Sequence, residues 1–379
     1  MAYETTKPAG FAIGAEWPLA ASLLTVGAFF AWGDAIFARL AEPLWFGLCF
    51  GLLFGVILVS AFAIVRHAEC LAIKLGEPVG TLILTLSVIG IEVMMISASM
   101  ATGQGSPTLA RDAMFSVVMI VLNGLVGLSL LLGGLRHHEQ AYNLQGAAVY
   151  LAMIASLSVL GLILPNFTTA TSGPTLSTIQ GILLGLMSVG LYATFLFGQT
   201  TLHREYFLDV NPAGGSKSSV EDHGGLVLRS LAFHAALLVC YLVPLVVLSK
   251  KLAIPIDHGI RVLGAPPELG GFIIAALVLS PEAFTALRAA KRNQLQRSVN
   301  LLLGSVLATI GLTIPAVFGI GVLSGKSIIL GLMPAEMILL ALTLGVSFIT
   351  FTSRRTNVLL GAVHLLLFFA YLILIFDVP

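Results

Sequence analysis

The chain has 379 residues, of which 58% are hydrophobic and only 10% charged. Soluble globular chains carry roughly 45–50% apolar and about 25% charged residues, so a single soluble domain is excluded, together with disorder, collagen-like repeats and coiled coils. The net charge of +1 provides no field that would attract nucleic acid. We therefore expect an all-α polytopic membrane protein, because a transmembrane β-barrel would alternate polar and apolar residues.

Apolar stretches of about 20 residues predict transmembrane helices. Eleven such stretches occur, at 17–38, 45–65, 79–101, 113–134, 145–165, 176–198, 226–249, 270–290, 299–322, 333–351 and 357–377. The first is interpreted as a retained helix and not as a signal peptide, because its apolar run is long and Lys7 alone precedes it.

The distribution of lysine and arginine predicts the orientation of these helices. With eleven spans, 13 of the 19 basic residues fall on the side of the N-terminus and 6 on the other side. Because cytoplasmic loops carry the excess of positive charge, we expect a cytoplasmic N-terminus and a periplasmic or extracellular C-terminus in the cell (inner) membrane.

The longest polar interruption divides the chain into two halves. Residues 199–225 are rich in Gly, Ser, Asp and Glu and follow the sixth span, which is typical of a cytoplasmic linker. We expect an N-terminal tail and first helix at 1–44, a first five-helix repeat at 45–198, the linker at 199–225 and a second five-helix repeat at 226–379.

Two carboxylates lie well inside apolar spans. A charged side chain at the centre of a bilayer costs somewhere between about 3 and 10 kcal/mol or more, so such a residue usually marks function. Of the 18 acidic residues only Glu92 and Glu282 have this position. They occupy the third and eighth spans, which cross the membrane in opposite directions because an odd number of spans separates them. Inverted repeats that meet at the midplane are a recurring plan of transporters.

The residues beside both glutamates predict interrupted helices. Pro281 has no N–H and should free the carbonyl of Leu277, and Gly90 should weaken the other helix. Freed carbonyls at membrane depth are tolerated where they line a cavity or meet a cation. Two carboxylates with backbone oxygens form a hard-oxygen site that suits Ca²⁺ or Na⁺.

At these residues the sequence resembles the Ca²⁺:cation antiporter superfamily, and within it the calcium/proton exchangers of ChaA type. The stretch AECLAIKLGEPVGTLILTLSVIGIE is similar to the first repeat, which ends in an Asn-Ala-Thr-Glu motif, and Glu92 falls on its acidic residue. The stretch SPEAFTALRAAKRNQLQRSVNLLLGSVLATIGLTIP is similar to the second repeat. There Glu282 falls on the acidic residue, Asn293 on a Lys-Asn-Lys loop, Gly304 and Ser305 on a Gly-Ser pair, and Pro315 on a closing proline.

The chain departs from the motifs at three positions. The asparagine three residues before each glutamate is Ile89 in one repeat and Leu279 in the other, and the glutamine after the Gly-Ser pair is Ala308. These changes remove side-chain carbonyls that would help to hold a divalent ion. We expect backbone oxygens and polar side chains near the glutamates to support the cation site in their place. The candidate residues are Gly90, Asn123, Leu277, Ser280, Pro281, Ser305 and Thr309.

The resemblance implies an antiporter that exports Ca²⁺ in exchange for H⁺ through one site shared by Glu92 and Glu282. A carboxylate that is buried or placed beside a second carboxylate binds a proton more readily, whereas a bound cation favours the ionised pair. Cation and protons would therefore take turns at the site. A Na⁺/H⁺ or K⁺/H⁺ antiporter on the same scaffold is the alternative, because the motif asparagines are missing.

Other chemistry has weaker support in the sequence. His234 and His364 fall inside spans and could relay protons, although packing is the more common role of such residues. The chain has no GxSxG or HExxH motif and no paired cysteines, so we expect no enzyme, zinc site or cofactor. The expected partners are the lipid bilayer and inorganic cations, with no nucleic acid and no protein partner.

Overall fold

A computed structural model describes residues 16–76, 79–101, 107–208, 227–325, 328–353 and 355–376. Within these ranges, eight helices are long and apolar enough to cross a membrane and three apolar helices are shorter, so each of the eleven predicted spans corresponds to a helix. The elements of the first half are α1 (Trp17–Ala31), α2 (Gly33–Phe37), α3 (Pro43–Leu75), α4 (Val79–Ala101), α5 (Leu109–Val118), η2 (Met119–Leu125), α6 (Val126–His137), β1 (Gln140–Ala141), α7 (Leu144–Ser158), η3 (Val159–Ile163), η4 (Leu164–Asn166), α8 (Thr178–Phe197), η5 (Gly198–Leu202) and η6 (Arg204–Phe207). Those of the second half are α9 (Leu231–Val262), α10 (Glu268–Lys291), α11 (Leu295–Ser324), α12 (Pro334–Thr350), β2 (Arg355–Thr356) and α13 (Val358–Ile375).

Over the described residues the structure is all-α, as expected, apart from one short two-stranded sheet. The strands β1 and β2 form a two-stranded antiparallel ladder in which Gln140 pairs with Thr356 and Ala141 with Arg355. This ladder joins the loop after α6 to the loop after α12, and it ties the two halves of the chain together at one end of the bundle.

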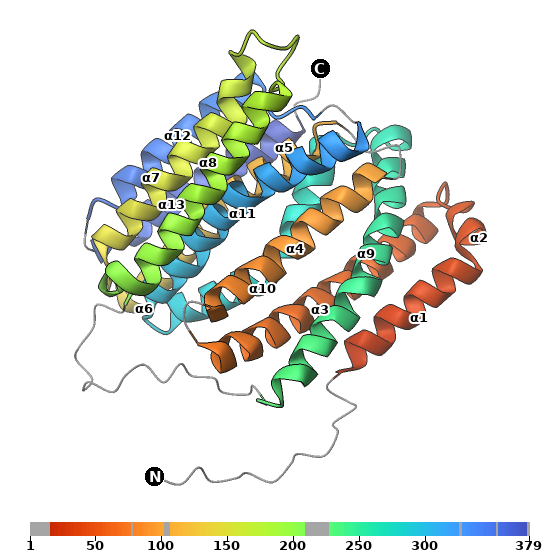
Figure 1. The fold of residues 1–379 in the computed structure, drawn as a ribbon, viewed down its shortest axis with the longest axis horizontal. Helices are drawn as coiled ribbons and strands as arrows, with labels where there is room; N and C mark the ends of the chain where they lie inside the picture. Colours follow the sequence, from red (N-terminus) through yellow and green to blue (C-terminus); the bar gives the residue numbers. More distant parts are fainter. Residues whose placement is uncertain are drawn as a thin grey trace.

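Helices of the two halves pack in an exchanged pattern. If the spans of the two halves are matched in order, α3 corresponds to α9, α4 to α10, α6 to α11 and α8 to α13. Helix α4 packs against α9, and the corresponding helices α10 and α3 pack against each other. Likewise α11 packs against α8, and the corresponding helices α6 and α13 pack against each other. In Figure 1, α1, α3 and α9 lie together on one side, α7, α8, α12 and α13 lie on the other, and α4, α10 and α11 run between them. Two repeats of five spans that interlock in this manner place the second helix of each repeat, α4 and α10, at the centre of the molecule.

The spans that carry the two glutamates are continuous, which corrects the prediction of interrupted helices. Both α4 and α10 run as α-helix through Gly90 and Pro281. Nearby hydroxyls bond backbone carbonyls in this part of α10, because Ser280 donates to the carbonyl of Ala276 at 2.5 Å and Thr285 donates to that of Pro281 at 3.1 Å. Serine and threonine side chains of this kind allow proline inside membrane helices. The regular α-helix is interrupted elsewhere, by the π-helical segments η2 and η3.

The predicted linker begins later than the composition suggests. Helical turns continue past residue 198 as η5 and η6, and Asn300 donates a hydrogen bond at 2.6 Å to the carbonyl of Phe207. The ring of Phe207 also packs against Tyr150. The apolar side chains of this stretch explain why it docks on α7 and α11. The linker residues 209–225 lie outside the described residues.

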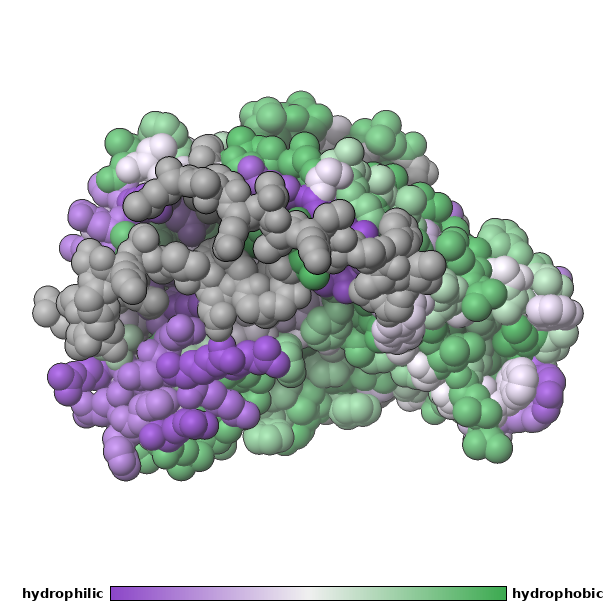
Figure 2. Space-filling view, turned by 90° about the horizontal axis from the view of Figure 1, so that it is seen from below, coloured by the Kyte–Doolittle hydropathy of each residue, from purple (hydrophilic) through white to green (hydrophobic). Residues whose placement is uncertain are grey.

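Large apolar side chains cover the outer surface of the bundle. Leu24 on α1, Leu186 on α8 and Leu359 on α13 are all exposed. Seen from below, hydrophilic residues gather toward one end of the molecule and apolar residues cover much of the rest of that face (Figure 2). An apolar outer surface of this extent is stable in contact with lipid and not in water.

The helices α6 and α13 approach each other at two glycines. A β-carbon on Gly127 would lie 2.9 Å from Cβ of His364 and 3.0 Å from the carbonyl oxygen of Gly361. A β-carbon on Gly361 would in turn lie 2.7 Å from the backbone nitrogen of Leu131. Glycine is required here because backbone atoms, which cannot rotate away, occupy the space, and small residues permit this close packing of membrane helices.

We expect Gly127→Ala to lower the stability of the protein by about 1–3 kcal/mol, because the added methyl group would force α6 and α13 apart. The measurement is the midpoint of thermal unfolding in detergent. Gly345→Ala on α12 is the matched control, since a β-carbon there meets nothing within 4 Å. Equal midpoints for the two variants would contradict the close contact.

Candidate cation site

The two intramembrane glutamates converge on one helix. Glu92 comes from α4 and Glu282 from α10, and both helices pack against α11. Thr309 donates a hydrogen bond to Oε2 of Glu92 at 2.9 Å. Ser305 donates to Oε2 of Glu282 at 2.6 Å. Both carboxyl groups are therefore held by hydroxyls of α11.

The spacing of those two hydroxyls sets the separation of the carboxyl groups. Ser305 and Thr309 are four residues apart, so they lie on the same face of α11 about one turn from each other. Glu282 bonds the first of these hydroxyls and Glu92 the second, so the two carboxyl groups lie at neighbouring turns of α11. One acid from each repeat thus reaches a common position between α4, α10 and α11, as the inverted-repeat interpretation expects.

The two carboxyl groups differ in their access to the outside of the protein. Glu92 is 1% exposed, whereas Glu282 is half-buried. Atom Oε1 of Glu92 has no hydrogen-bond partner among the described residues. A buried oxygen without a partner is unfavourable, and a carboxylate oxygen in this state is suited to bind a proton or a cation. Glu92 therefore retains an open ligand position.

The other predicted ligands of α4 and α10 contribute little from their side chains. Ser280 donates to the carbonyl of Ala276 of its own helix, and Leu277 and Pro281 are buried. Gly90 lies two residues before Glu92, and a β-carbon on it would meet only the terminal methyl of Met94, at 3.9 Å. Helix α10 continues through Leu277, whose carbonyl lacks the usual donor four residues later because Pro281 has no N–H.

Asn123 does not bond either glutamate. It lies in the π-helical segment η2 and donates to the hydroxyl of Thr343 at 2.8 Å, while its carbonyl oxygen lies 3.4 Å from Nδ1 of His364. Thr350 completes this buried cluster through Nε2 of His364 at 2.9 Å. The expectation that Asn123 supports the cation site is not met by these contacts, because its amide is used to join η2, α12 and α13.

Thr313 is the residue that the sequence reasoning missed. It lies four residues beyond Thr309 on α11 and is fully buried. Its hydroxyl has no hydrogen-bond partner among the described residues, and it lies one turn beyond Thr309, which bonds Glu92. The signal was present, because Ser305, Thr309 and Thr313 recur at intervals of four, which places hydroxyls on one helix face.

The histidines singled out in the sequence bond groups other than the two glutamates. His234 accepts a hydrogen bond from the backbone N–H of Arg229 at 3.0 Å, and its Nδ1 lies 2.9 Å from Nδ1 of His67. Glu16, just before α1, lies 3.2 Å from Nε2 of His67. His137 contacts the carbonyl of Lys291 at 3.0 Å. These contacts join the residue before α1 to α3 and α9, and the end of α6 to the end of α10.

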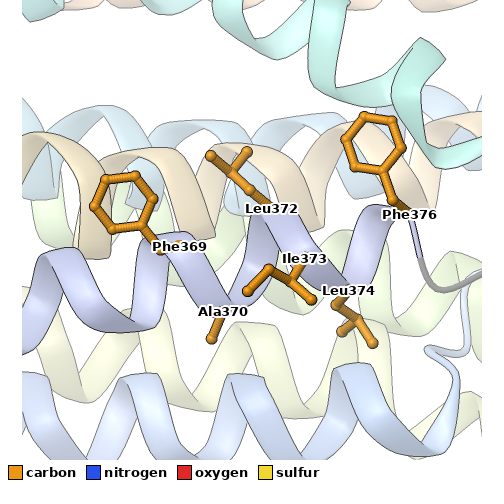
Figure 3. A pocket seen from close by; sticks show the side chains of 6 residues that line it. All are labelled: Phe369, Ala370, Leu372, Ile373, Leu374 and Phe376. Carbon is orange, nitrogen blue, oxygen red and sulfur yellow. The ribbon is translucent and has the colours of Figure 1, made fainter.

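A wide recess on the outer surface has the wrong chemistry for a cation. Six residues of the last turns of α13 line it, namely Phe369, Ala370, Leu372, Ile373, Leu374 and Phe376 (Figure 3). All of these side chains are apolar, so the recess suits an acyl chain. Among the described residues no group of three or more His, Cys, Asp or Glu could hold a metal ion.

Comparison with known proteins agrees with this arrangement of helices. Residues 45–201 and 233–376 match the sodium/calcium exchanger protein family. The chain belongs to this family. The sodium-potassium/proton antiporter ChaA of Escherichia coli is 43% identical over 84% of this chain and 86% of its own length. An ionic transporter of Sinorhizobium fredii, y4hA, is 45% identical over the same shares of the two chains.

Solved structures of exchangers share the fold. The Ca²⁺/H⁺ antiporter YfkE superposes with a TM-score of 0.70 at 17% identity, over 96% of this chain and all of that one. The H⁺/Ca²⁺ exchanger CAX superposes with a TM-score of 0.63 at 16% identity, over 96% of this chain and 89% of that one. At these identities the likeness concerns the fold, which is the inverted-repeat fold of this exchanger family.

Proposed function

We propose that the protein is a secondary active cation/proton antiporter that exports Ca²⁺ in exchange for H⁺ by alternating access at Glu92 and Glu282. The observation that carries this proposal is the convergence of one carboxyl group from each repeat on adjacent hydroxyls of α11. Two acids from opposed repeats form a single site. Movement of one repeat against the other can open this site to the two sides of the membrane in turn. Membership of the exchanger family supports the same proposal.

Coupling follows from competition for the same oxygens. An empty pair of buried carboxylates carries two negative charges in a medium that solvates them poorly, so it takes up protons or a cation. A bound cation stabilises the ionised pair and displaces the protons. The doubly charged empty site is too costly to be carried across the occluded state, and each direction of the cycle therefore carries one of the two substrates.

Exchange of Na⁺ or K⁺ for H⁺ is the second candidate, and two observations favour it. Ca²⁺ takes 6–8 oxygen ligands. Among the described residues, the side-chain hydrogen bonds to the two carboxyl groups come from the hydroxyls of Ser305 and Thr309, while the amide of Asn123 bonds elsewhere. In addition, the relative from Escherichia coli that is 43% identical is named as a sodium-potassium/proton antiporter.

The remaining expectations extend the proposal to the whole chain. We infer a transporter without enzymatic activity or bound cofactor, in the cell (inner) membrane, with a cytoplasmic N-terminus and a periplasmic or extracellular C-terminus. Residues 1–44, 45–198, 199–225 and 226–379 are taken as the tail with first helix, the first repeat, the linker and the second repeat. The polytopic helical structure and the distribution of basic residues support this assignment.

Everted membrane vesicles that hold a pH gradient test the choice of cation. We expect the addition of CaCl₂ to collapse the gradient in vesicles that contain the protein, because cation entry is coupled to proton exit. Collapse with NaCl or KCl and not with CaCl₂ would select the second candidate. Vesicles without the protein are the control, and a gradient that survives all three salts would contradict antiport altogether.

A further inference from the structure

Two buried side-chain oxygens on packed helices have no hydrogen-bond partner among the described residues. They are Oε1 of Glu92 on α4 and Oγ1 of Thr313 on α11. Glu92 is 1% exposed and Thr313 is 0% exposed, so bulk water does not satisfy either atom. Thr309, one turn before Thr313, donates to the other oxygen of the same carboxyl group, which places Thr313 on the face of α11 that Glu92 contacts. One oxygen of Glu92 and the hydroxyl oxygen of Thr313 are therefore both open to a ligand.

A threonine in a membrane helix usually satisfies its hydroxyl on its own backbone. Thr25, Thr194 and Thr200 do so in this protein, each by donating to the carbonyl four residues earlier. Thr313 does not make this bond. The lone pairs of its hydroxyl oxygen are therefore available to a ligand.

The position of Thr313 continues a row of hydroxyls along α11. Ser305 bonds Glu282 and Thr309 bonds Glu92, and Thr313 follows at the same interval of four residues. The row therefore extends one turn beyond the two glutamates on the side of Glu92. Hydroxyl and carboxylate oxygens are ligands that hard cations prefer.

We propose that the hydroxyl oxygen of Thr313 is a ligand of the transported cation, which it holds together with Oε1 of Glu92. This inference rests on the proposed function, because it assigns a further ligand to the same site. A cation between the two oxygens supplies the missing positive charge to both. Thr313 thereby contributes a neutral oxygen where the amides of the related motifs are absent from this chain.

Thr313→Val tests the assignment, because valine has nearly the same shape and lacks the oxygen. Exchange is measured in everted vesicles with CaCl₂, NaCl and KCl in turn, using the cation that the wild-type protein exchanges. We expect the cation concentration for half-maximal exchange to rise about tenfold, which corresponds to about 1.4 kcal/mol, with the maximal rate unchanged. Thr313→Ser keeps the oxygen and should restore the wild-type value.

Ser347→Ala is the matched control, because Ser347 on α12 is also fully buried and its hydroxyl bonds no residue in the part of the chain that the structure describes. It should leave the half-maximal concentration unchanged. An unchanged half-maximal cation concentration in Thr313→Val would overturn the assignment. A shift of the pH profile of exchange without any change in the cation dependence would overturn it as well, because Thr313 would then affect only the proton. Normal exchange in glutamine variants of Glu92 and Glu282 would instead contradict the proposed function itself.

Discussion

Replacement of Glu92 or Glu282 by glutamine is expected to abolish exchange. Glutamine keeps the size of the side chain and can still accept the hydrogen bond from Thr309 or Ser305. It neither ionises nor binds a proton under physiological conditions, so the competition between cation and proton disappears at that position. Because both acids contribute to one site, either single variant should lower the initial rate of cation-driven gradient collapse to the background of vesicles without the protein.

Folding of these variants should be intact, because a neutral amide in a buried position is less costly than a carboxylate. Equal amounts in the membrane and an unchanged elution profile in detergent would establish this. Glu139→Gln is the matched control, since Glu139 lies at an exposed site where it pairs with Arg355. It should exchange at the wild-type rate. Exchange at that rate in Glu92→Gln or in Glu282→Gln would refute the shared site.

Replacement of Arg111 by methionine is expected to lower the stability of the protein by about 3–5 kcal/mol. The guanidinium of Arg111 pairs with Asp112 at 2.7 Å and also donates to the carbonyl of Gly331, and its side chain is only 6% exposed. Removal of the positive charge leaves the carboxyl of Asp112, which is 1% exposed, without its partner. The loop before α12 loses its attachment to α5 at the same time.

The midpoint of thermal unfolding in detergent measures this loss. Arg355→Met is the control, because the pair of Arg355 with Glu139 is exposed and exposed pairs contribute about 0–1 kcal/mol. The double variant of Arg111→Met and Asp112→Asn should recover much of the stability, since the buried carboxylate of Asp112 is then absent as well. Similar midpoints for the Arg111 and Arg355 variants would show that the buried pair of Arg111 and Asp112 contributes no more to stability than the exposed pair does.

The helices and the two acids were predictable because both follow from the cost of polar groups in lipid. Every span must satisfy its own backbone, so each appears as an apolar stretch that can be read directly from the residues. The same cost makes a carboxylate inside a span rare, which is why Glu92 and Glu282 could be recognised without any structure. The spacing of Ser305, Thr309 and Thr313 also predicts a row of hydroxyls on one face of α11. The sequence reasoning assigned only Ser305 and Thr309 to the site.

Local rules failed where neighbouring helices decide the outcome. Proline and glycine predicted interruptions at Pro281 and Gly90, but α10 and α4 remain helical inside the packed bundle. Asn123 looked like a ligand because of its residue type and depth. Its amide instead bonds Thr343 and lies beside His364, which come from helices more than 200 residues away along the chain.

Composition and hydropathy by themselves determined that this chain is a membrane protein with eleven apolar helices and a buried acid in each half, because these features depend on the transfer of single residues into lipid. Tertiary structure alone decided which oxygens meet. Helix periodicity states which residues share a face, but not the helix to which that face is turned. Helix α10 meets α11 within its own repeat, but only the packing of the two repeats brings α4 against α11, and with it Glu92 against a hydroxyl next to the one that holds Glu282.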